Sequence, residues 1–327
     1  MISIVNIQGL SMGAKFLLVL VVVATVSSNC RVQGALDRGF YDDSCPPFEV
    51  IVSGTVQSFL DRDPSVAPGL LRMLFHDAFV GGLDGSPLLN SSGGSDPPER
   101  LATPNLSLHG FDLIDAIKSK LEGICPGIVS CADILATAAR DAITLTNGPF
   151  WRVKFGRRDG RSSNFNEANH LPSPFEDANG LLAKFAAKGF TAEEMVLLQG
   201  GGHSIGVGHC PLIASRLSNP DPTLDPSYAA QLRPICSANA NAALPNDPVT
   251  PPLLDNQYFA NVQARKGLFT SDQELLFDGR TKPAIDKYAA SSSAFARDFS
   301  KAIQKLSELG VLTGSQGSVR KICAIAN

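Results

Sequence analysis

The strongest constraint on this chain is a set of cysteines that follows an apolar leader. The leader is the run at residues 16–26, preceded by Lys15 and followed by small and polar residues, an order typical of a secretory signal peptide. The alternative is a membrane anchor, but the run has only about half of the ~20 residues that a membrane span needs. We predict a signal peptide at residues 1–34, with Met12 as a second candidate start, and a mature domain at residues 35–327.

Cysteine usage agrees with secretion. The chain has seven cysteines, and Cys30 lies inside the predicted leader, which leaves an even number in the mature domain. An even number in an oxidising compartment indicates disulfides, although spacing alone does not choose among the many pairings. The mature cysteines are Cys45, Cys125, Cys131, Cys210, Cys236 and Cys323.

Composition excludes two classes of partner. Charged residues make up 18% of the chain and the formal net charge is −3, so the chain has no basic footprint for nucleic acid. The same balance gives no strong attraction to an anionic membrane. Apolar residues make up 44%, which is enough for a large core in 327 residues. We therefore expect no nucleic-acid partner and, once the leader is removed, no membrane partner.

Helical periodicity dominates the chain. Residues 131–146, 192–199 and 294–309 have the pattern of helices, and Thr191 with Glu194 forms a capping box at the start of the second. Clear alternating strands are scarce. The sequence therefore predicts an all-α protein with long functional loops between helices.

Two of the five histidines have informative neighbours, and His76 is the first. Arg72 lies four residues before it, so the two side chains share one face of a helix. A neutral imidazole beside a guanidinium combines a base with an anion stabiliser, the pair that peroxide cleavage requires. On spacing alone, an ordinary surface pair of histidine and arginine is the favoured alternative.

The second informative histidine is His203, which has glycines at 200–202 and 206. These glycines would let a flat ligand approach the backbone, and we expect them to loosen the end of the preceding helix. A helix end there places negative partial charge near the ring, which suits a metal or haem iron. A glycine-rich turn with an incidental histidine is an equal alternative. The chain has no Cys-x-x-Cys-His motif for covalent haem.

Two clusters of oxygen-bearing residues accompany these histidines. Carboxylates, hydroxyls and flexible backbone carbonyls suit calcium, although the spacing is not that of an EF-hand loop. Taken singly, each cluster is more often a turn with capping side chains. The first cluster is Asp77, Val80, Gly82, Asp84 and Ser86. The second cluster is Asp247, Thr250, Leu253 and Asp255.

Together the motifs resemble one family, the class III secretory plant peroxidases of the plant-type haem peroxidase superfamily. The resemblance runs from Phe40 to Asn327 and implies an all-α, two-lobed haem peroxidase fold with haem b between distal and proximal lobes. It implies reduction of hydrogen peroxide followed by one-electron oxidation of small phenolic donors, with two calcium ions bound. We also expect a monomer. The matching strings, in family order, are residues 41–46, 72–89, 129–133, 156–159, 202–206 and 267–274.

The resemblance also implies roles on the distal side. His76 would be the acid–base residue and Arg72 the charge stabiliser, while Phe75 would shield the oxidised iron. Asn105 would orient His76, with Glu99 behind it. The first oxygen cluster would be the distal calcium site, where Glu99 acts through water.

On the proximal side, the resemblance implies that His203 is the axial iron ligand and that Asp272 accepts its ring N–H. Pro172 would line the substrate channel. Ser204 would join the second oxygen cluster as the proximal calcium site, and it keeps the hydroxyl of a common threonine. The implied disulfides are Cys45–Cys125, Cys131–Cys323 and Cys210–Cys236.

Three departures from the family pattern stand out. A fourth bridge would flank the distal calcium loop, but its positions are Ala78 and Leu83, so we expect a looser loop there. His109 replaces a usual arginine. The string at 199–201, before Gly202 and His203, is unusually flexible in composition, so we expect the backbone that carries His203 to be less rigid.

The predicted location is outside the cell, in the apoplast. Asn90-Ser91-Ser92 is a glycosylation sequon, and a second sequon begins at Asn105, whose implied role needs an unmodified amide.

Two alternative functions remain. One is a secreted scaffold protein without turnover, and the other is an intracellular ascorbate-type peroxidase, which the leader and paired cysteines disfavour. Lignin precursors, extensin tyrosines and auxin all suit the implied site as donors.

Overall fold

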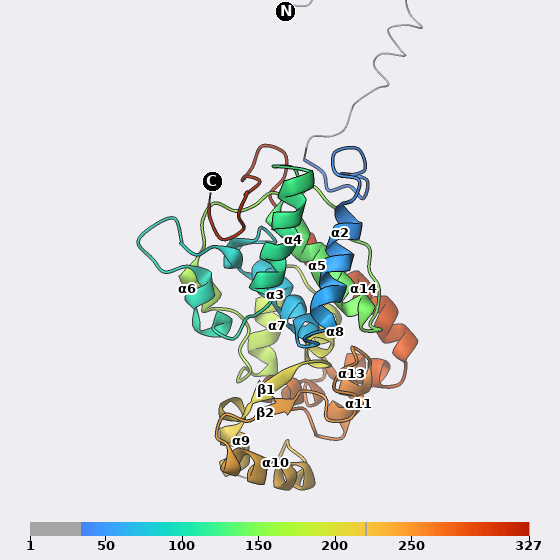
Figure 1. The fold of residues 1–327 in the computed structure, drawn as a ribbon. Coiled ribbons are helices and arrows are strands. Elements are labelled where there is room, and N and C mark those ends of the chain that lie inside the picture. Colours follow the sequence, from blue (N-terminus) through green and yellow to red (C-terminus); the bar gives the residue numbers. More distant parts are fainter. Residues whose placement is uncertain (1–33, 220, 327) are drawn as a thin grey trace, which may run out of the picture. The chain divides into compact units, whose positions relative to one another are not determined.

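Helices make up nearly all the regular structure in residues 34–219 and 221–326, the part of the chain that this computed structural model describes (Figure 1). This confirms the all-α prediction. The predicted leader, with Met12 and Cys30, falls outside the described residues except for residue 34. Within the described ranges, no helix has both the length and the apolar character to cross a membrane.

The elements are short to medium in length. The helices are α2 (Phe48–Leu60), α3 (Val66–Val80), α4 (Phe111–Ile124), α5 (Cys131–Leu145), α6 (Phe165–Ala168), α7 (Ala178–Ala187), α8 (Ala192–His203), α9 (Ala214–Ser218), α10 (Pro226–Ala238), α11 (Gln257–Gln263), α12 (Thr270–Gln273), α13 (Lys282–Ala289) and α14 (Ser292–Ser307). Single 3-10 turns are η1 (Ser86–Leu88), η2 (Glu99–Leu101), η3 (Thr103–Asn105), η4 (Cys210–Leu212) and η5 (Glu274–Leu276). Strands β1 (Val207–His209) and β2 (Ala243–Pro245) pair antiparallel, with Gly208 opposite Leu244.

The helix α5 lies at the centre of the larger core. It packs against α2, α3 and α4, as the neighbouring blue and green helices of Figure 1 show. Its sequence is rich in alanine, which lets these helices approach, and its residues from Cys131 to Ile143 are buried. Ser130 caps its start by accepting a hydrogen bond from the Asp133 N–H at 3.1 Å. This packing holds α3, the helix that carries Arg72 and His76.

The helix α8 contradicts one expectation. We expected glycines 200–202 to loosen its end, but the helix continues through them to His203. A Cβ atom at Gly200 would lie 2.5 Å from the ring of Phe259 on α11, and one at Gly201 would lie 2.2 Å from Phe299 on α14. These glycines therefore serve close helix packing, and the backbone that they free is covered by aromatic rings.

A smaller core lies around the two-stranded sheet of β1 and β2. It joins β1 and β2 to α9, α10 and the residues Leu268 and Phe269. Arg216 of α9 crosses this core and donates to the carbonyls of Gly267 and Leu268, both at 2.7 Å. Phe269 precedes α12, so this small core helps to place the carboxylate of Asp272.

Three disulfides tie the chain together, and they are the pairs that the family resemblance implies. The first joins the segment before α2 to the end of α4, the second joins the start of α5 to the C-terminal segment, and the third joins η4 to α10. The pairs are Cys45–Cys125, Cys131–Cys323 and Cys210–Cys236.

Candidate active site

The distal histidine, His76, lies on α3 with its side chain buried. Its Nδ1 lies 2.5 Å from Oδ1 of Asn105, and the Asn105 amide donates to the Glu99 carbonyl at 2.8 Å. The second bond fixes the amide, so its oxygen must face the ring and accept the Nδ1 proton. Nε2 is then the basic nitrogen of His76. Glu99 does stand behind Asn105, through its backbone carbonyl.

The electrostatic environment keeps His76 neutral. Burial, assisted by the positive charge of Arg72, lowers the pKa of His76 to about 3, although the bond to Asn105 opposes the shift. A neutral imidazole can accept a proton, as a general base must.

Arg72 shares a face of α3 with His76, as the spacing predicts. Its Nη1 donates to Oγ of Ser107 at 2.8 Å, and its Nη2 donates to the carbonyl of Pro104 at 2.6 Å. Both acceptors flank Asn105, so one short segment holds both the guanidinium and the imidazole. Neither Pro104 nor Ser107 was predicted from the sequence, because a backbone carbonyl leaves no signal in residue type and a lone serine hydroxyl leaves only a weak one.

Phe75 lies beside the distal pair, half-buried on α3. Its ring stacks on Phe79 with centroids 4.7 Å apart and on Phe185 of α7 at 5.9 Å. The ring is therefore held by a small aromatic cluster rather than left to rotate.

The proximal histidine, His203, ends α8. Its Nδ1 lies 2.7 Å from Oδ1 of Asp272, and its ring meets Phe269 edge-on at 5.2 Å between centroids. The His203 side chain is 32% exposed while that of Asp272 is 1% exposed. Since the buried carboxylate holds Nδ1, Nε2 is the nitrogen that faces outward for a ligand. The other histidine of this region, His209, is exposed on β1.

Asp272 accepts hydrogen bonds from several directions. Oδ1 accepts from Tyr258 at 2.9 Å and from Gln199 at 3.2 Å, in addition to His203, and Oδ2 accepts from the Phe269 N–H at 3.1 Å. Burial alone would raise the pKa of Asp272, but His203, the Phe269 N–H and the Tyr258 hydroxyl lower it below its ordinary value. The sequence analysis missed Tyr258 and Gln199, although the four-residue spacing from Gln199 to His203 was a usable signal.

The two histidine sites are physically linked, because α3 contacts α8. Beyond His203, a Cβ atom at Gly206 would lie 3.0 Å from Cβ of Pro68 on α3. An outward Nε2 on one helix and a neutral base with a guanidinium on the other form a donor set that fits a haem iron and its peroxide.

The distal oxygen cluster is partly assembled. Asp77 Oδ2 accepts from the Gly85 N–H at 2.8 Å, and Asp84 Oδ1 accepts from the Ser86 N–H at 3.0 Å. Burial raises the pKa of Asp77 and of Asp84, and for Asp77 the charges of Asp84 and Glu99 add to the effect. A buried Asp77 and a half-buried Asp84 close together fit a divalent cation, which would offset both the loss of water and the repulsion that Asp77 experiences.

Two backbone groups of this cluster have other contacts. The Val80 carbonyl accepts a hydrogen bond from Lys188 Nζ at 2.9 Å, so the lysine ammonium group already faces this carbonyl. Gly82 has φ of +108°, and a Cβ there would lie 2.3 Å from the Gly310 carbonyl oxygen.

Glu99 is buried, its Oε2 has no hydrogen-bond partner in the described chain, and burial raises its pKa to about 7. That atom suits a bridging water at the cluster.

The proximal oxygen cluster centres on buried Asp247. Thr250 Oγ1 lies 3.2 Å from Asp247 Oδ2 and 3.2 Å from Asp255 Oδ1. Ser204 is buried next to His203, and Asn246 binds the Ile205 carbonyl at 3.1 Å, which draws Asp247 towards Ser204. Leu253 donates its N–H to the Thr250 carbonyl at 3.0 Å.

The described residues hold no group of three or more histidine, cysteine and acidic side chains of the kind that binds a metal. Each oxygen cluster has fewer than three carboxylates, and the other oxygens in each cluster belong to hydroxyl groups and backbone carbonyls. These are ligands that calcium accepts.

Comparisons with known proteins agree with this geometry. A family model described as peroxidase matches residues 52–291. The chain belongs to the peroxidase family. Peroxidase 27 of Arabidopsis thaliana is 46% identical over 300 residues, covering 89% of this chain and 92% of that protein. Peroxidase 56 and Peroxidase 1 of the same plant are 45% and 43% identical, over 95% and 97% of this chain and 97% and 100% of theirs.

These relatives confirm the resemblance to the plant peroxidases, so the chain is a haem peroxidase that acts on hydrogen peroxide. The family also implies bound calcium in general.

Three further predictions for this peroxidase concern the substrate channel, the glycosylation sequons and His109. Pro172 is half-buried, and its neighbour Pro174 accepts from the Ser271 N–H at 3.1 Å, beside Asp272. Asn90 is exposed, whereas Asn105 is 2% exposed, so only the first sequon is accessible to a glycan in the folded protein. His109, in place of arginine, lies 2.9 Å from the Ser65 carbonyl at the start of α3.

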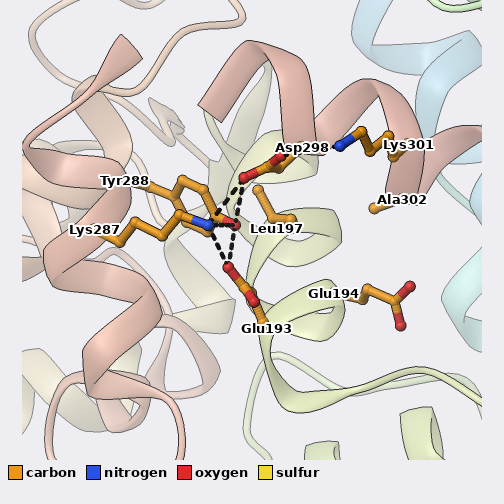
Figure 2. A pocket seen from close by; sticks show the side chains of 8 residues that line it. All are labelled: Glu193, Glu194, Leu197, Lys287, Tyr288, Asp298, Lys301 and Ala302. Atoms are coloured by element: carbon orange, nitrogen blue, oxygen red, sulfur yellow. Dashed lines mark hydrogen bonds and ion pairs between the residues drawn. The ribbon is translucent and has the colours of Figure 1, made fainter. Parts of the chain in front are cut away.

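A separate pocket lies at the other end of α8. It measures about 270 Å³, and Figure 2 shows Lys287 between Glu193 and Asp298, at 2.7 and 2.9 Å. Tyr288 donates to Glu193 at 2.6 Å. This ammonium and the two carboxylates join α8, α13 and α14, so the ion pairs brace the proximal helix from its N-terminal end. The pocket is lined by Glu193, Glu194, Leu197, Lys287, Tyr288, Asp298, Lys301 and Ala302.

Proposed function

We propose that this peroxidase is secreted, binds one haem b through His203, and cleaves hydrogen peroxide with His76 and Arg72 before oxidising small phenolic donors. One observation carries the proposal, which is that two histidines on contacting helices have opposite partners. His76 is buried against the Asn105 amide, and His203 is bonded to the Asp272 carboxylate. The first arrangement suits proton transfer and the second suits ligation of a metal.

On the distal side, the two electrons that reduce the peroxide bond would come from bound haem. His76 Nε2 takes the proton of the nearer peroxide oxygen, since Nδ1 is protonated and held by Asn105. The same nitrogen then returns this proton to the departing oxygen, which leaves as water. Arg72 meets the negative charge that develops on that oxygen. Phe75 would keep water from the centre, supported by its stack on Phe79.

On the proximal side, His203 would hold the haem iron through Nε2. Asp272 fixes the tautomer by accepting the Nδ1 proton at 2.7 Å, and its charge makes the imidazole a stronger electron donor. This electron donation would stabilise the haem iron in the oxidised form that each one-electron oxidation of a phenolic donor requires.

Two calcium ions complete the proposal. Their donors are the distal and proximal oxygen clusters, the second together with Ser204, and Glu99 joins the distal ion through water. The support is the burial of Asp77, which is next to His76 in the chain, and of Asp247 together with Ser204, which is next to His203. Elemental analysis of the purified protein should return two calcium ions and one iron per chain.

Secretion rests on residues 1–34 as a signal peptide and on three disulfides, which persist in an oxidising compartment. We further propose that the mature protein is an apoplastic monomer, glycosylated at Asn90, and that donors reach the haem edge past Pro172. N-terminal sequencing of protein secreted by plant cells tests the leader. A mature chain that begins far from residue 35 would contradict the proposed cleavage.

The decisive experiment is steady-state kinetics on haem-loaded residues 35–327 with hydrogen peroxide. A panel of phenols and ascorbate serve as alternative donors. We expect haem binding with a Soret band, and phenol oxidation faster than ascorbate oxidation. Haem binding without turnover would support a scaffold protein, and a preference for ascorbate would support the intracellular type.

A further inference from the structure

We propose that Gln199 is a positioning residue that weakens the pull of Asp272 on His203 and so raises the reduction potential of the iron. The inference rests on the proposed role of His203 as the haem ligand. It concerns the first residue of the glycine-rich string that leads to the proximal histidine.

The geometry places Gln199 and His203 on the same carboxylate. The two residues are four apart on α8, so their side chains leave the helix on one face. Gln199 Nε2 lies 2.8 Å from the Ser271 carbonyl oxygen and 3.2 Å from Asp272 Oδ1. Both neighbours are pure acceptors, so the amide must present its NH₂ group there. The side chain is buried, at 9% exposure, which holds it in this position.

A single oxygen of Asp272 is therefore shared by three donors. Oδ1 accepts from His203 at 2.7 Å, from Tyr258 at 2.9 Å and from Gln199 at 3.2 Å. Each additional donor withdraws negative charge from the oxygen, so less is left to polarise the His203 N–H. A less polarised imidazole donates less charge to the iron, and the ferric state loses part of its stabilisation.

The neighbouring glycine makes the arrangement possible. A Cβ at Gly200 would lie 3.1 Å from Cδ1 of Tyr258, as well as 2.5 Å from the ring of Phe259. With a side chain at 200, the Tyr258 ring could not approach α8 so closely. The two unusual residues thus act together, because Gln199 supplies one donor to Asp272 and Gly200 admits the ring that supplies another.

The test compares Gln199→Met and Gln199→Leu with the wild-type holoenzyme. Methionine keeps the length and most of the volume of glutamine but cannot donate. Two quantities are measured, which are the ferric/ferrous reduction potential by spectroelectrochemistry and the iron–histidine stretching frequency of the ferrous form by resonance Raman spectroscopy. We expect a lower potential and a higher stretching frequency in both variants. Tyr258→Phe should shift both quantities in the same direction, and further, because its bond is shorter.

Leu198→Met is the matched control, since it changes packing at the adjacent buried position without removing a donor. It should leave both quantities unchanged. An unchanged or raised potential in Gln199→Met would overturn the inference while leaving His203 as ligand. If instead the iron–histidine band is missing in the wild type, or persists unaltered in His203→Ala, the proposed function itself fails and the inference falls with it.

Discussion

The two histidine sites use the same side chain for opposite purposes, and their partners explain how. His76 donates its Nδ1 proton to an uncharged amide oxygen, while burial and the nearby Arg72 cation lower its pKa and keep Nε2 available for a proton. His203 donates its Nδ1 proton to a buried carboxylate, which makes its Nε2 a stronger ligand.

The supports of the two sites also differ. On the distal side, Asn105 and the groups that accept hydrogen bonds from Arg72 lie on one short segment. The bonds that fix the Asn105 amide and one nitrogen of Arg72 end on backbone carbonyls. On the proximal side, α8 is locked by aromatic rings packed on Gly200 and Gly201. The distal site can therefore be adjusted through a loop, whereas the proximal site is set by helix packing. The predictions below test this contrast.

The largest expected effect is at the iron ligand. His203→Ala should lose haem or fold poorly, because no neighbouring side chain can replace Nε2 at that position. His209→Ala, on exposed β1, is the control and should keep a normal Soret band. Absorbance spectra during haem titration give the answer. Full haem retention with an unchanged spectrum in His203→Ala would rule out the assignment.

The next effect is on the distal chemistry. A general base and a charge stabiliser are each typically worth a factor of about 100 or more. His76→Ala and Arg72→Leu should each slow the reaction with hydrogen peroxide by at least that factor, measured by stopped-flow absorbance. Oxidation of a phenol by the already oxidised enzyme should suffer less. Near-normal rates with peroxide in His76→Ala would show that the proton goes elsewhere.

Helix packing gives the third prediction. Gly201→Ala should lower the free energy of unfolding by about 1–3 kcal/mol, because its Cβ would lie 2.2 Å from the Phe299 ring in a packed core. Gly202→Ala is a matched control, since nothing lies within 4 Å of its Cβ position, and alanine favours a helix over glycine by about 1 kcal/mol. Denaturant unfolding of both variants measures the difference. Equal stabilities would mean that α8 is not locked by α14.

The sequence predicted most of what depends on residue type and local spacing. The all-α class, the capping box of Thr191 and Glu194 and the shared face of Arg72 and His76 follow from periodicity and spacing alone. The disulfide pairing came only from the family resemblance, because spacing permits many pairings.

What could not be predicted depends on contacts between distant segments. The role of Gly200 and Gly201 requires knowing that Phe259 and Phe299 lie against α8, more than fifty residues away in the chain. Likewise, Tyr258 of α11 and Gln199 of α8 meet at Asp272 of α12 only through the packing of these helices. Flexible glycines and close-packed glycines look the same in a sequence, so the expected loosening of α8 was wrong.

The smallest expected effect concerns the missing distal bridge. The chain-entropy model gives a six-residue loop roughly 2 kcal/mol, and the structure supplies partial substitutes for it. Leu83 N–H donates to the Leu309 carbonyl at 3.0 Å, Gly82 packs on Gly310, and Arg320 donates to the Gly85 carbonyl at 2.6 Å. The loop is therefore tied to the C-terminal segment at three places, and less freedom is left for a bridge to remove.

We therefore expect Ala78→Cys with Leu83→Cys to slow calcium release under chelator only modestly, by less than the tenfold or more that roughly 2 kcal/mol would give. Mass spectrometry must first confirm that the bridge has formed. The matched variant Arg320→Lys keeps the charge but weakens the bond to Gly85, because lysine lacks the fixed fork of arginine. It should speed calcium release. The opposite result would be that the bridge slows calcium release by much more than tenfold while Arg320→Lys leaves the release rate unchanged. In that case the C-terminal segment does not hold the loop, and the distal calcium site depends on local chain entropy alone.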